Sequence, residues 1–186
     1  DRISRGENDT RLVSLGLVHP LTSRVHLQIQ VAHSDLDGTF TSPLGQSDSE
    51  TRRLSVRAQT DVALRDNLAV SLGLEVQRER ASSTFITGAT FNTIPVRRRV
   101  VGSFGEARID TGQLFVTAGL RVEHIRRNLL EGNPNAFSPR QTFDAASEVS
   151  ANPKLSLGYF LQPAAARSRS WTRLRFSAGT GIRPPD

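Results

Sequence analysis

The 186-residue sequence contains no cysteine and no methionine, and aromatic residues make up only 6% of it. Because cysteine is absent, the chain has neither a disulfide framework nor a thiolate metal site. Because it lacks an initiator methionine and a basic-then-apolar leader, we expect it to be a processed or excised piece of a longer protein. No run approaches the ~18 apolar residues of a membrane helix, which excludes a helical span but not a barrel of half-apolar strands.

Lysine is nearly absent as well. Lys154 is the only lysine among 24 basic residues, so the net charge of +6 comes from arginine. A basic chain first suggests nucleic acid or another polyanion. These arginines, however, are spread over predicted strand faces and strand ends, as at residues 97–99 and 126–127, with no aromatic-studded nucleic-acid motif among them. A charged, solvated rim that could face lipid phosphates explains this distribution better, and we predict no nucleic-acid partner.

What the sequence does contain is alternation of apolar and polar residues, in eight stretches. Since successive side chains of a strand point to opposite faces, each stretch predicts a strand with one apolar and one wet face. A strand of ~10 residues with lipid on one side and water on the other spans an outer membrane as part of a closed barrel. The clearest apolar sets are Val25, Leu27, Ile29 and Val31, and then Leu54, Val56, Ala58, Val62 and Leu64.

The alternation predicts strands at residues 10–18, 24–37, 51–64, 68–80, 96–110, 113–127, 149–161 and 171–181. The connections sort into a shorter set at residues 19–23, 65–67, 110–112 and 162–170, and a longer set at residues 38–50, 81–95 and 128–148. Outer-membrane barrels have short periplasmic turns and long extracellular loops. The predicted fold class is therefore all-β: an antiparallel transmembrane β-barrel segment of about eight consecutive strands in an up-and-down meander, a curved open sheet if the chain stands alone.

A soluble antiparallel sandwich is the alternative, because it also alternates core against solvent. Three observations count against it: strands longer than the usual ~5 to 6 residues, connections sorted by length, and one continuously aliphatic face. In its favour, the aromatic girdle expected at the bilayer interfaces is thin, with Tyr159, Trp171 and Phe176 as its best candidates. The stretch 96–110 fits least well, since Val100-Val101 and Phe104 leave its facing undecided.

Four short motifs in the second half of the chain resemble those of TonB-dependent outer-membrane receptors. Residues 152–159 read NPKLSLGY and residues 173–185 read RLRFSAGTGIRPP, which is similar to a hairpin that recurs in that family. Residues 114–122, reading LFVTAGLRV, and residues 104–107, reading FGEA, resemble its recurrent strand and the approach to it. The order and spacing of the four motifs carry the resemblance, which covers about residues 96–185 in motif terms.

The resemblance implies a 22-stranded barrel whose lumen is filled by an N-terminal plug domain. Extracellular loops would capture the substrate, and a TonB-type periplasmic energy transducer would release it by pulling on the plug through the missing N-terminal part. The sequence shows no plug and no transducer-binding box. We therefore expect residues 1–186 to be a partial β-barrel domain of a larger receptor in the cell outer membrane. Its expected partners are outer-membrane lipid and lipopolysaccharide, the plug of the same protein, and the transducer.

Catalytic and metal-binding constellations are not found. His26 and His33 are seven residues apart on one predicted strand, hence on opposite faces, and cannot chelate together. A polar lumen position explains His26 better than catalysis does. No nucleophile elbow is present, and Gly179-Thr180-Gly181 does not open a helix as a phosphate loop would. We predict no enzyme activity, no catalytic residue, no cofactor and no metal.

Charged residues on the predicted lumen face are the candidate site. They could hold the plug through hydrogen-bonded ion pairs, or they could merely pair across neighbouring strands and keep the wall wet. The function implied is energised uptake of a bulky, scarce nutrient such as an iron-siderophore or cobalamin. The alternatives are a passive porin or adhesin barrel and a soluble all-β binding module. The candidate residues are Arg53, Arg57, Asp61, Glu75, Arg121 and Glu123.

Overall fold

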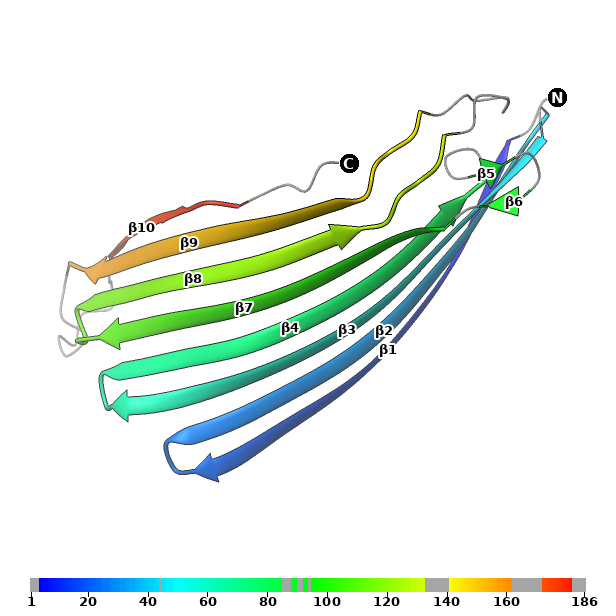
Figure 1. Ribbon diagram of the computed structural model, residues 1–186. Helices are drawn as coiled ribbons and strands as arrows, with labels where there is room; N and C mark the ends of the chain where they lie inside the picture. Colours follow the sequence, from blue (N-terminus) through cyan, green and yellow to red (C-terminus); the bar gives the residue numbers. More distant parts are fainter. Residues whose placement is uncertain are drawn as a thin grey trace.

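The computed structural model describes residues 4–43, 45–84, 88–89, 92–93, 95–132, 141–161 and 172–181. Eight strands lie side by side in one antiparallel sheet, in the order in which they follow one another along the chain (Figure 1). This confirms the predicted all-β meander. The strands of this sheet are β1 (Arg5–Thr22), β2 (Val25–Ser42), β3 (Gly45–Arg65), β4 (Leu68–Ser83), β7 (Val96–Asp110), β8 (Leu114–Arg127), β9 (Ala146–Phe160) and β10 (Arg173–Gly179).

The strand positions agree with the sequence prediction, and β7 has the predicted bounds. The first three strands are longer than predicted. In particular, the connection expected at residues 38–50 is wrong, because β2 and β3 stay paired until Ser42 faces Gly45. Gly45 has a φ of 134°, which favours glycine, and this tight turn replaces the expected long loop.

The other two connections at that end are long, as predicted. Between β4 and β7 lies a small separate hairpin of β5 (Gly88–Ala89) and β6 (Asn92–Thr93). Between β8 and β9 an isolated bridge joins Leu130 to Phe143. At the opposite end the turns are short: residues 66–67 join β3 to β4, and in the turn after β7 the Gly112 N–H donates to Asp110 Oδ1 over 2.8 Å. The predicted connection at residues 162–170 lies outside the described residues.

The register gives the sheet two different faces. The face that we call the apolar face carries Leu72 and Leu74, whose exposed fractions are 57% and 62%. Among the described residues, Leu130 is the one hydrophobic residue that is buried. A soluble protein of this length would hide its aliphatic residues in a core, whereas large exposed apolar surfaces mark contact with lipid or a partner. The other face, which we call the polar face, carries Arg57, Glu75 and Arg121.

The pairing also resolves the facing of β7, which the sequence left undecided. Val101 lies opposite Val76 on the apolar face, whereas Phe104 lies opposite Gly73 on the polar face. The apolar face extends along β4 from Leu68 to Val76. At ~3.4 Å per residue and a tilt of ~40°, these outward positions cover ~20 Å of the barrel axis, which suits an apolar band ~25 Å tall once the side chains are included.

The sheet is open in the described part of the chain. Its order runs from β1 to β10, and these two strands are not paired with each other, as expected for a barrel segment standing alone. None of the described residues forms a helix that is long and apolar enough to cross a bilayer.

The ends of the sheet make a testable prediction about orientation. If the end of the sheet with the two long connections lies outside the cell, the tight turn between β2 and β3 lies outside as well. Epitope tags inserted at Pro43 or Gly132 of the intact protein should then be reached by antibody on intact cells. A tag at Asp66, in the short turn between β3 and β4, should be reached only after permeabilisation. Surface labelling at Asp66 would show that the orientation is reversed.

Candidate functional site

All six predicted lumen residues lie on the polar face, because each has the strand parity that the pairing register assigns to that face. Arg53 and Arg57 of β3 lie opposite Glu79 and Glu75 of β4. Glu75 in turn lies opposite Gly102 of β7, which lies opposite Glu123 of β8. The alternation therefore placed these side chains on the same surface. It did not show which of them would meet.

A cluster of three of the predicted residues crosses three strands. The Arg121 guanidinium donates to Glu75 over 3.1 Å and to Glu123 over 2.7 to 2.8 Å. Gly102 lies between the two glutamates, and a Cβ at that position would lie 3.6 Å from Arg121 Nη2. A methyl group would be in ordinary contact with the guanidinium, but a larger side chain would occupy the path along which the arginine reaches across β7 to β4. The three side chains are half-buried, with exposed fractions of 36% for Arg121 and 22% for each glutamate.

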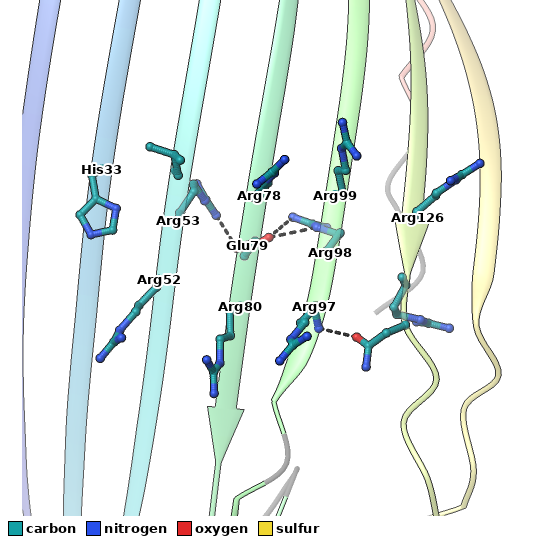
Figure 2. A pocket seen from close by; sticks show the side chains of 13 residues that line it. His33, Arg52, Arg53, Arg78, Glu79, Arg80, Arg97, Arg98, Arg99 and Arg126 are labelled. Atoms are coloured by element: carbon teal, nitrogen blue, oxygen red, sulfur yellow. Dashed lines mark hydrogen bonds and ion pairs between the residues drawn. The ribbon is translucent and has the colours of Figure 1, made fainter.

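A second cluster joins Arg53 to residues that the sequence analysis did not single out. Glu79 accepts from Arg53 over 2.9 Å and from Arg98 over 2.7 Å (Figure 2). The carboxylate is 15% exposed and lies between the two guanidinium groups. Two arginines on flanking strands thus neutralise one glutamate on β4. The sequence signal was available, since Glu79 follows Glu75 with the same parity, but the partners depend on the register.

Arg57 and Asp61 have no ion pair with one another or with any other described residue. Asp61 accepts hydrogen bonds from Gln28, Gln59 and the Ser71 hydroxyl over 2.8, 2.7 and 2.5 Å. Arg57 donates to the amide oxygen of Gln59 over 2.8 Å, and its guanidinium carbon lies 4.7 Å from the centre of the Phe104 ring. Neutral groups thus solvate both charges, but no opposite charge among the described residues balances either of them.

The Phe104 ring is held close to the wall by a glycine on the neighbouring strand. A Cβ at Gly73 would lie 2.2 Å from Phe104 Cζ, so the ring occupies the space that a side chain would take. Beside it is a hollow of about 260 Å³ that opens on the polar face. Phe104 breaks the apolar-polar alternation, and that break is the signal that could have identified it. The polar lining of the hollow includes Arg57, Ser71, Glu106, Arg121, Asn152 and Lys154.

The described residues contain no group of three histidine, aspartate or glutamate side chains that could hold a metal ion. His26 lies opposite Asp61 on the polar face, and His33 lies opposite Leu54 on the apolar face, so the two histidines are separated by the sheet as the parity predicts. The surface is one of arginine, carboxylate and amide groups, which bind polar or charged ligands.

Comparison of the sequence with known protein families identifies the family of the chain. The sequence matches, over residues 1–186, the family described as TonB dependent receptor-like, beta-barrel. The chain belongs to this family. The resemblance of its short motifs is thereby confirmed.

Solved structures share the fold of this receptor-barrel segment. The ferric-catecholate import receptor Fiu from E. coli K12 is 11% identical with a TM-score of 0.61, and the match covers 84% of this chain and 34% of that one. The translocator domain of the autotransporter NalP from Neisseria meningitidis is 14% identical with a TM-score of 0.54, covering 83% of this chain and 55% of that one. The chain thus spans about a third of Fiu. No curated protein matches the sequence.

Proposed function

We propose that this chain is a section of the barrel wall of an outer-membrane receptor that takes up a bulky, scarce nutrient with energy supplied from the periplasm. The observation that carries the proposal is the family match over residues 1–186 to a sheet with one aliphatic and one charged face. The receptor would act with a plug domain of the same protein and with a TonB-type transducer. The soluble binding module is disfavoured by the exposed aliphatic face, which includes Leu15 at 74% exposure.

The lumen face supports a contact with the plug at one part of the wall in particular. Arg121, Glu75 and Glu123 satisfy one another, as Arg53 does with Glu79 and Arg98, so these groups stabilise the wall itself. Arg57 and Gln59 line the open hollow beside Phe104, and Asp61 is joined to this hollow through its hydrogen bond from Gln59. We therefore assign the plug or substrate-path contact to Arg57, Asp61 and the rim of the hollow, and a wall-forming role to the others.

Uptake by the intact receptor tests the function. Fiu is a ferric-catecholate import receptor, and a ferric catecholate is accordingly the first nutrient to test, followed by cobalamin. Cells that carry the intact receptor should accumulate the labelled nutrient, and removing the transducer or dissipating the proton gradient should abolish accumulation. A passive porin would instead let small solutes equilibrate with or without the transducer. Equilibration that is independent of energy would overturn the proposal in favour of the porin alternative.

A further inference from the structure

Arginines gather on the apolar face at the end with the long connections. They occupy two adjacent rungs, each made of residues that lie directly opposite one another on neighbouring strands. Figure 2 shows their side chains near the long-connection end of β3, β4, β7 and β8, which points downward in this view. An open hollow of about 530 Å³ is lined by these arginines and by Leu54, among other residues. We call these six residues the arginine rungs: Arg52, Arg80 and Arg97 form the rung nearer the long connections, and Arg78, Arg99 and Arg126 form the rung nearer the short turns.

The arginine rungs lie next to the aliphatic band, on its side nearer the long connections. The next rung toward the short turns contains Val56, Val76 and Val101, which also lie opposite one another. An arginine that faces lipid at the middle of a bilayer is costly, whereas one at the interface is tolerated. The change from valine on one rung to arginine on the next therefore marks the edge of the hydrocarbon layer. It puts the guanidinium groups at the level of the lipid headgroups.

The charges of these arginines are poorly compensated by the protein. Like charges directly opposite one another destabilise a sheet. Arg52 pairs with Glu50, but Arg78, Arg80, Arg97 and Arg99 have no acidic partner among the described residues. The contrast with the other face is sharp, because inward-facing Arg98 sits between Arg97 and Arg99 in the chain and still reaches Glu79 over 2.7 Å. These outward charges are therefore available to anions from outside the protein.

The two edges of the apolar band differ. On the rung at the opposite edge, the described outward residues are Leu68, Ile109, Val116, Leu157 and Phe176, with Arg65 as the one arginine. Phosphates of ordinary phospholipids border both leaflets, so they would not favour one edge over the other. The choice of arginine is also informative, since its planar fork binds phosphate through two parallel hydrogen bonds, which the ammonium group of lysine cannot do.

We infer that the arginine rungs form a binding site for the phosphate groups of a glycolipid in the outer leaflet, such as lipopolysaccharide. Arg78, Arg80, Arg97 and Arg99 donate to the phosphates, and the lipid chains lie against the valine rung next to them. This site rests on the proposed outer-membrane location but not on the nutrient that is transported. Loss of lipid binding and loss of uptake are therefore separate results.

The test compares two variants of the intact receptor, each lacking four positive charges. The site variant carries Arg78→Gln, Arg80→Gln, Arg97→Gln and Arg99→Gln. The control variant carries Arg24→Gln, Arg65→Gln, Arg108→Gln and Arg175→Gln, all outside the arginine rungs. After extraction from outer membranes in mild detergent, the lipopolysaccharide that remains bound is measured as phosphate per receptor. The site variant should retain about tenfold less than the wild type, whereas the control should retain the same amount.

Added probes identify the source of the phosphate. Delipidated receptor should bind vesicles that contain bisphosphorylated lipid A, and should not bind vesicles in which the same lipid has been dephosphorylated. Equal retention by both variants, or equal binding to both vesicles, would overturn the inference. Binding of soluble pyrophosphate as strong as that of the vesicles would replace the lipid with a soluble anion. If the site variant does not assemble, the pair Arg78→Gln and Arg99→Gln is measured in the heat-modifiable, folded fraction.

Discussion

Replacing Leu72 with arginine in the intact receptor is expected to impair assembly and to destabilise the folded barrel by about 2 to 4 kcal/mol. Leu72 lies at the middle of the apolar band on β4, half-way between Leu68 and Val76, and its side chain is 57% exposed. An arginine there would meet hydrocarbon without a counter-ion, because its neighbours across the sheet are Thr60 and Gly105. Urea unfolding in lipid vesicles, followed by the heat-dependent shift on a gel, measures the loss. Leu27→Arg should behave similarly.

Gln28→Arg is the matched control for this prediction. Gln28 lies at a similar height but on the polar face, where its amide donates to Asp61 over 2.8 Å. An arginine at that position can pair with the same carboxylate, so assembly and unfolding should change little. If Leu72→Arg and Gln28→Arg were tolerated equally, the assignment of the two faces would be wrong.

Replacing Arg121 with leucine is expected to destabilise the barrel by about 1 to 3 kcal/mol, because two half-buried carboxylates lose their shared charge partner. Glu75 and Glu123 both accept from this guanidinium, and Gly102 between them offers no side chain to replace it. The measurement is again urea unfolding, with wild type and variant in the same vesicles.

The cluster also provides its own rescue experiment. In the Arg121→Leu background, Glu75→Gln and Glu123→Gln remove both negative charges and should restore most of the lost stability, since a neutral amide costs less than an unpaired carboxylate. Equal stability of Arg121→Leu with and without the two glutamine substitutions would show that the wall does not depend on this charge balance.

The alternation in the sequence was sufficient to predict most strands and both faces. Residues 96–110 were delimited as the structure has them, because Pro95 precedes the strand and the Asp110-Thr111-Gly112 turn ends it. The prediction failed near Ser42 and Gly45, where β2 and β3 continue as a hairpin. Above the apolar band both faces of a strand meet water, so the hydrogen bonds continue after the alternation has ended. Serine, proline and glycine in that segment then indicated a loop.

The contacts within the candidate site were less predictable than its facing. Parity places Arg53, Glu75 and Arg121 on the polar face, but which of them touch depends on the pairing register and on residues that lack a side chain. Gly102 lets Arg121 reach Glu75, and Gly73 makes room for Phe104. Both glycines lie on strands other than those of the side chains they accommodate. Only the paired sheet brings them together, so the sequence of any single strand does not contain the information.

The order of the strands has a consequence for how the sheet forms. The strands of the long sheet lie in their order along the chain. Adding each new strand to the sheet therefore closes only one connection. The connections from β1 to β2, β2 to β3, β3 to β4 and β7 to β8 are short, whereas the other three are long, and the one from Arg127 to Ala146 is the longest. By loop-closure entropy, closing it costs about 2 kcal/mol more than closing a two-residue turn. Docking of β9 onto β8 is therefore the expected slow step, and the bridge between Leu130 and Phe143, which shortens the free part of that connection, would speed it.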